Sequence, residues 1–165
     1  MRPWRMGVEK KAEETVVALG DALRRRGWRM ATAESCTGGL VASTMTNVAG
    51  SSDWFEGGVV AYDNRVKMRL LGVQAEVLAR DGAVSRACVE AMVRGVCELM
   101  GVQVGVAISG IAGPSGGTPG KPVGTVWVAW MADGRVWSDA FLFRGSRLEI
   151  KEQSMRAALA GLDLA

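Results

Sequence analysis

The positions of apolar residues along the chain follow two periods, one typical of helices and one typical of strands. From residue 9 to residue 26, apolar residues recur at helical spacing, and Gly27 follows as a stop signal. The residues expected on the apolar face are Ala12, Val16, Val17, Leu19 and Leu23. The stretch 102–108 is dense in β-branched residues without polar alternation, which predicts a strand buried on both faces. The same criteria predict strands over 28–34, 54–62, 123–131 and 136–143, and helices over 38–48, 64–71, from about 74, over 85–100 and over 146–162.

Local signals fix several of these boundaries. Ser85 is a typical N-cap residue, and Ser146 with Glu149 fits a capping box. Asp133-Gly134 between two strands is a strong hairpin signal, and Gly57-Gly58 inside a strand marks a bulge or a close backbone approach. The order predicts an α/β fold, a three-layer α/β/α sandwich with a mixed, mostly parallel five-stranded sheet and a C-terminal hairpin. Residues 1–165 are expected to form one domain.

Composition narrows the function classes. The 165 residues carry a net charge of +3 without a dense basic stripe, and Arg24-Arg25-Arg26 fits a solvated helix end, so a nucleic-acid partner is not expected. Three cysteines without paired spacing indicate reduced thiols in the cytoplasm, and no signal peptide or membrane-spanning run is recognisable. The chain has no histidine, which excludes Ser-His-Asp and Cys-His catalysis. A hydrolase here must activate its nucleophile with a lysine, a carboxylate or a tyrosine.

Three segments follow predicted parallel strands, where ligands bind in sheets of this kind. The first, 34–39, runs into a helix whose free amides can bind an anion, although an ordinary capped turn explains it equally well. The second is 62–67. The third, 109–117, holds four glycines, whose amides can hold a phosphate or an oxyanion, and its length favours a functional loop.

Candidate nucleophiles and bases lie in or near these segments. Lys67 follows the second strand, and a lysine pressed against a desolvated pocket loses its proton more easily. Ser51 or Ser52 could be the hydroxyl it deprotonates, if the fold brings them together. Cys36 is a competing nucleophile, although a small buried thiol is the more common outcome. The scattered carboxylates make a metal site improbable.

Six motifs, in order along nearly the whole chain, closely resemble the C-terminal domain of the competence-damage protein CinA. They are Ala33-Glu34-Ser35-Cys36-Thr37-Gly38-Gly39, Ala49-Gly50-Ser51-Ser52-Asp53-Trp54-Phe55, Tyr62-x-Asn64-x-x-Lys67, Gly82-Ala83-Val84-Ser85, Ile108-Ser109-Gly110-Ile111-Ala112-Gly113-Pro114 and Lys121-Pro122-Val123-Gly124-Thr125-Val126. The chain departs from the family at two loop positions, with Ser115 where aspartate is frequent and Gly120 where glutamate is frequent.

The resemblance implies hydrolysis of nicotinamide mononucleotide to nicotinic acid mononucleotide and ammonia, by a serine and a lysine without metal or cofactor. It implies Ser52 as nucleophile, Lys67 as base and Tyr62 as the residue that orients them or shuttles a proton. It also implies a homodimer that binds a small-molecule substrate. The residues expected to bind substrate are Ser35, Thr37, Gly38, Gly39, Ser109 and Gly110, with Arg147 near the phosphate. The alternative is a non-catalytic nucleotide-binding or protein-interaction module linked to competence, which would have no reason to keep Ser52, Tyr62 and Lys67.

Overall fold

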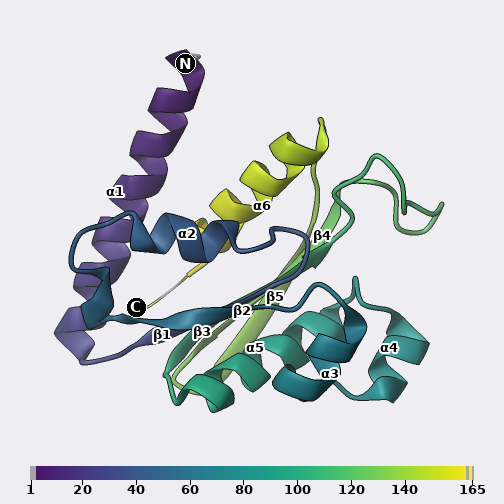
Figure 1. Ribbon diagram of the computed structural model, residues 1–165, viewed down its shortest axis with the longest axis horizontal. Helices are drawn as coiled ribbons and strands as arrows, with labels where there is room; N and C mark the ends of the chain where they lie inside the picture. The colour runs from purple at the N-terminus through teal and green to yellow at the C-terminus, as the bar shows by residue number, and fades with distance from the viewer. Residues whose placement is uncertain (1–2, 163, 165) are drawn as a thin grey trace.

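A computed structural model describes residues 3–162 and 164 of the chain, with side chains from residue 11 onward. The elements follow the predicted order, with one added 3-10 turn, η1 (Figure 1). They are α1 (Pro3–Arg26), β1 (Met30–Glu34), α2 (Leu40–Thr46), η1 (Ser51–Asp53), β2 (Phe55–Val60), α3 (Asn64–Leu71), α4 (Ala75–Asp81), α5 (Arg86–Met100), β3 (Val104–Gly110), β4 (Thr125–Ala132), β5 (Arg135–Leu142) and α6 (Arg147–Ala160).

The five strands form one sheet in the order β2-β1-β3-β4-β5. Strand β1 pairs in parallel with β2 and β3, whereas β4 is antiparallel to both β3 and β5. Four strands therefore point the same way and β4 points the opposite way. Helices α1, α2 and α6 cover one face of the sheet, and α3, α4 and α5 cover the other (Figure 1). The predicted three-layer sandwich is confirmed.

The local signals act as expected. Ser85 Oγ accepts the Cys88 amide at 3.2 Å, and the capping box of Ser146 and Glu149 is complete. Asp133 and Gly134 both have positive φ, of 48° and 83°, as a tight two-residue hairpin requires. The register between β1 and β2 skips Glu56, so a bulge lies beside Gly57. Helix α1 begins at Pro3, earlier than the predicted residue 9. The prediction started too late because residues 3–8 lack the apolar period from which the start of the helix was placed.

Two arginines bind the turn that precedes β2, at the edge where the parallel strands of the sheet begin. Arg24 donates to the Gly50 carbonyl at 2.9 Å and to the Asp53 carboxylate at 3.3 Å. Arg29 donates to the Ser52 and Asp53 carbonyls at 3.2 and 2.9 Å. Arg24 was expected only to be solvated at a helix end, but it also holds the turn that precedes β2.

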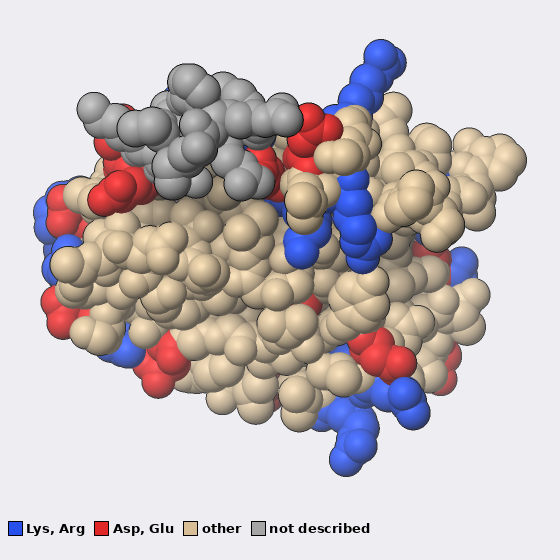
Figure 2. Space-filling view, turned by 45° about the horizontal axis from the view of Figure 1, so that its top comes forward, with Lys and Arg blue, Asp and Glu red and all other residues tan. Residues whose placement is uncertain are grey.

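Sulfur and indole groups lie in the core as expected. Cys88 and Cys97 are buried, and buried Trp130 donates its indole N–H to the Ala158 carbonyl at 2.8 Å. Among the described residues, none of the helices has both the length and the apolar character needed to cross a bilayer. On the face shown in Figure 2, Lys and Arg side chains lie in separate groups among acidic and uncharged residues.

Close packing of α3 on α5 depends on a glycine. A β-carbon at Gly95 of α5 would overlap the Leu71 carbonyl oxygen at the end of α3. Backbone atoms cannot rotate aside as side-chain ends can, so only glycine allows the two helices to lie this close. The position of α3 matters because this helix carries Lys67.

We predict that Gly95→Ala lowers the free energy of unfolding by about 1–3 kcal/mol through overpacking, although alanine favours helices. Urea denaturation measures this change. The control is Gly120→Ala, where a β-carbon would meet nothing within 4 Å, and we expect a change within about 0.5 kcal/mol. Equal stability of Gly95→Ala and the wild type would contradict the close contact.

Candidate active site

A cavity of about 310 Å³ opens at the carboxyl ends of β1, β2 and β3. Its walls come from the turn after β1, the start of α3, the α4–α5 turn, the glycine loop after β3 and the first residue of α6. This is the edge at which the sequence predicted a ligand site. The lining residues are Ser35, Cys36, Tyr62, Asn64, Lys67, Ala83, Val84, Ser109, Gly110, Ile111, Ala112, Gly113, Ser115, Gly116 and Arg147.

Lys67 and Ser35 meet at the base of this cavity. The Lys67 side chain is buried, and its residue is 1% exposed. Its Nζ donates to Ser35 Oγ at 3.2 Å and to the Tyr62 carbonyl at 3.1 Å. Asp63 caps α3 by accepting the Arg65 amide at 2.8 Å, which sets the direction in which Lys67 leaves the helix. A serine hydroxyl and an amine at this separation can exchange a proton.

The backbone around Ser35 is held on both sides. The Ser35 amide donates to the Ile108 carbonyl of β3 at 2.9 Å. The Ser35 carbonyl accepts the Gly38 amide at 3.1 Å, and Gly38 has a φ of 63° that favours glycine. Ser35 is therefore placed by the end of a central strand and by a tight turn, both of which are rigid supports for a reacting group.

A buried carboxylate closes the start of α2. Glu34 is 1% exposed, and its two oxygens accept the amides of Gly39, Val41 and Ala42 at 3.0, 3.1 and 2.8 Å. These are amides that the sequence offered as a candidate anion site. Glu34 supplies that negative charge from within the chain, so a substrate phosphate does not have these amides available.

Burial in the cavity shifts both the Lys67 amine and the Cys36 thiol towards their uncharged forms. Burial lowers the pKa of Lys67, while nearby Cys88, Asp63 and Cys36 act in the opposite direction. Burial also raises the pKa of Cys36 to about 12, and the Glu34 charge adds to this, so its thiolate is scarce near neutrality. The thiol is thus a poor nucleophile here.

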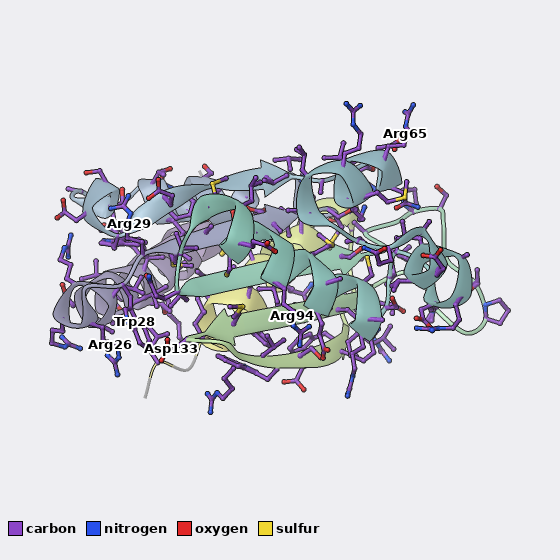
Figure 3. All side chains as sticks on the ribbon, turned by 90° about the horizontal axis from the view of Figure 1, so that it is seen from below. Arg26, Trp28, Arg29, Arg65, Arg94 and Asp133 are labelled. Atoms are coloured by element: carbon purple, nitrogen blue, oxygen red, sulfur yellow. The ribbon has the colours of Figure 1, made fainter. Side chains whose placement is uncertain are left out.

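Ser52, the expected nucleophile, does not lie beside Lys67. It belongs to η1, which precedes β2, whereas Lys67 follows β2. Arg29, which binds the Ser52 carbonyl, and Arg65, which neighbours Lys67 on α3, lie at opposite ends of the molecule in Figure 3. The five residues of β1 separate the two edges by about 16 Å, at ~3.3 Å per residue. The expected contact of Ser51 or Ser52 with Lys67 is therefore corrected, and Ser35 takes that place.

Tyr62 contributes differently from the expectation. Its carbonyl, not its hydroxyl, contacts Lys67. Its exposed ring directs the hydroxyl towards Arg147, whose guanidinium donates to it at 3.1 Å and to the Gly113 carbonyl at 2.7 Å. Arg147 thus bridges the second and third segments over the cavity.

The remaining predicted residues divide into two groups. Ser109 and Gly110 line the cavity, and a β-carbon at Gly110 would crowd Cys36 Sγ at 3.1 Å. Thr37, Gly38 and Gly39 are not among the lining residues, and the buried Thr37 hydroxyl has no hydrogen-bond partner in the part of the chain that the structure describes. The turn 37–39 continues from Ser35 and Cys36 into α2.

Ala83 and Val84 line the cavity but lie outside the three segments that the sequence placed at the ligand edge. Asn64 and Ser115 lie within those segments, although the sequence assigned them no individual role. The position of Asn64, directly after a strand and at the start of a helix, was a usable signal. Nothing in the spacing of Ala83 and Val84 indicates that the α4–α5 turn reaches this edge. Within the described residues, His, Cys, Asp and Glu side chains form no group of three or more suited to a metal ion.

Comparison with known families agrees with the order of motifs and the fold. Residues 11–164 match the family model described as the CinA C-terminal domain. The chain belongs to the CinA C-terminal domain family. Among curated relatives of this CinA domain, it is 51% identical over 144 residues to nicotinamide-nucleotide amidohydrolase PncC of Pseudomonas putida, covering 87% of this chain and 90% of that protein. The corresponding protein of Enterobacter agglomerans is 47% identical over 147 residues, with coverage of 88% and 90%.

The family also includes longer proteins and solved structures. A CinA-like protein of Desulfotalea psychrophila is 46% identical over 141 residues, but this CinA domain spans 34% of its length. The crystal structure of the competence damage-inducible protein A from Klebsiella pneumoniae superposes with a TM-score of 0.87 at 40% identity, covering 90% of this chain and 92% of that chain. The competence/damage inducible protein of Agrobacterium tumefaciens gives 0.88 at 39% identity with the same coverage.

Proposed function

We propose that this protein hydrolyses the carboxamide of nicotinamide mononucleotide to nicotinic acid mononucleotide and ammonia, with Ser35 as nucleophile and Lys67 as base. The observation that carries the proposal is the 3.2 Å contact between the buried Lys67 Nζ and Ser35 Oγ at the base of a cavity. The name of the relatives that are about half identical, nicotinamide-nucleotide amidohydrolase, supports the same reaction class.

The first half of the reaction forms an ester on Ser35. Neutral Lys67 accepts the hydroxyl proton while Ser35 Oγ forms a bond to the carboxamide carbon. The glycine loop after β3 lines the cavity, and we assign backbone amides of this loop as donors to the oxyanion. Such a donor contributes about 3–4 kcal/mol to the transition state. The carbon–nitrogen bond then breaks, and ammonia leaves with the proton held by Lys67.

The second half releases the acid. A water molecule gives a proton to Lys67 and adds to the ester carbon. When this intermediate collapses, the bond to Ser35 Oγ breaks and the serine regains its proton from Lys67. The sum is one amide and one water converted into one carboxylic acid and one ammonia, and neither residue is consumed.

The other walls fit the rest of the substrate. Arg147 presents its guanidinium at the mouth of the cavity between Tyr62 and the glycine loop, where it can bind the phosphate. Ser109, 1% exposed, and Asn64 line the space near the reacting groups and supply polar contacts for the carboxamide. A homodimer stays a prediction that rests on the family resemblance, and a cytoplasmic location stays one that rests on the unpaired cysteines.

Variants of the three candidate nucleophiles test the assignment. We expect Ser35→Ala to lower kcat/KM for nicotinamide mononucleotide by at least about 1,000-fold, because the ester cannot form. Ser52→Ala and Cys36→Ala should retain activity within a few-fold of the wild type. Ammonia release is measured, with circular dichroism to show that each variant is folded. Full activity of Ser35→Ala with loss in Ser52→Ala would reverse the assignment.

The pH profile tests the base. Burial lowers the pKa of Lys67 from its usual 10.5, so we expect kcat/KM to rise with pH and to level off at an inflection below 10.5. The unfolded chain holds this proton more tightly, so the free energy of unfolding also rises between the lowered pKa and 10.5. Lys67→Arg, whose side chain stays charged, should be inactive at every pH. An active Lys67→Arg enzyme would remove Lys67 from the mechanism.

A further inference from the structure

A substrate phosphate needs positive groups at the cavity, and one obvious source is already occupied. The amides at the start of α2 bind the Glu34 carboxylate through three hydrogen bonds of 2.8 to 3.1 Å. A second anion beside this buried carboxylate would meet like charge. The phosphate is therefore not expected at the start of α2, and the cations of α6 are another source of positive charge near the cavity.

Two cations on α6 face the turn that carries Ser35. Arg147 begins the helix and Lys151 follows four residues later, so both lie on the same side of α6. Lys151 Nζ lies 3.7 Å from the point where a β-carbon on Gly38 would stand, so it lies over the turn 35–39. Both charges act on the Cys36 thiol, which lines the cavity. Arg147 thus lines the cavity, and Lys151 lies beside the turn whose first residues, Ser35 and Cys36, form one of its walls.

Lys151 differs from its neighbours in having no polar partner. It makes no hydrogen bond or ion pair with any residue that the structure describes, although it is partly buried. Glu149 is engaged in the capping box with Ser146, and Arg147 is held by Gly113 and Tyr62. A partly buried ammonium group without a counter-ion, beside an arginine at a cavity mouth, is suited to an anion.

We propose that Lys151 forms, together with Arg147, a two-cation subsite for the phosphate monoester of the substrate. This inference rests on the proposed function, and it adds a residue that determines preference for the nucleotide over the nucleoside. The planar guanidinium of Arg147 orients the phosphate. The ammonium of Lys151 adds a compact positive charge, whose flexible stem lets it adjust to the position of the phosphate.

The experiment compares substrates with and without the phosphate. For Lys151→Met, we expect KM for nicotinamide mononucleotide to rise about 10-fold, the loss typical of one charge-assisted contact, with kcat changed less. Activity on nicotinamide riboside, which lacks the phosphate, should not change. The control is Arg156→Met, which removes the same charge from the same helix at a position that lines a separate surface hollow, and we expect both substrates to be unaffected.

A binding measurement separates this proposal from the proposed function. Ribose 5-phosphate should bind the wild type in a calorimetric titration, and about 10-fold more weakly to Lys151→Met, whether or not the amide is hydrolysed. Equal losses for both substrates, the same loss in Arg156→Met, or unchanged ribose 5-phosphate binding in Lys151→Met would each overturn the subsite. Absence of ammonia release from the wild type would overturn the proposed function alone.

Discussion

The arrangement of this molecule depends on burying one amine against one hydroxyl. Transfer of a charged ammonium group from water to a protein interior costs several kcal/mol, and Lys67 is compensated there by hydrogen bonds to Ser35 Oγ and the Tyr62 carbonyl and by the nearby charge of Asp63. The neutral amine avoids most of this cost. The same burial that opposes the charge therefore suits Lys67 to the proposed role of base, and Asp63 and Gly95 matter because they fix the helix that carries it.

The candidate site lies at the carboxyl edge of the sheet, although serines in glycine-containing turns occur at both edges. At the amino edge, Arg24 and Arg29 hold the turn 50–53 by its carbonyl groups. At the carboxyl edge, the turn after β1 presents Ser35 to the cavity and Glu34 anchors the helix that follows. Because the buried Glu34 carboxylate occupies the amides at the start of α2, we propose that the substrate phosphate binds at α6 instead.

Most of the fold could be predicted because its signals are local. The caps at Ser85 and Ser146 and the turn at Asp133-Gly134 act through neighbours a few residues away, so the sequence shows them directly. The edge that holds the site was also predictable from the parallel strands. The predicted contact between Lys67 and Ser52 was wrong. It was taken from the motifs that carry the two residues, without regard to the direction of β2. A residue that precedes this strand and a residue that follows it must lie at opposite edges of the sheet. Glu34 binds amides only five to eight residues further along the chain, but its burial beneath α2 could not be read from the spacing. The proposed role of Lys151 depends on the packing of α6 beside the turn 35–39.

The state of the buried amine can be measured directly. The chain has five lysines, and a carbon-13 label at their ε-carbons allows each to be titrated by NMR, with the Lys67→Met variant identifying the resonance of Lys67. The account predicts that Lys67 titrates below 10.5, separately from the exposed lysines, and that Ser35→Ala alters its midpoint. A Lys67 midpoint at or above 10.5, unchanged by Ser35→Ala, would contradict the account.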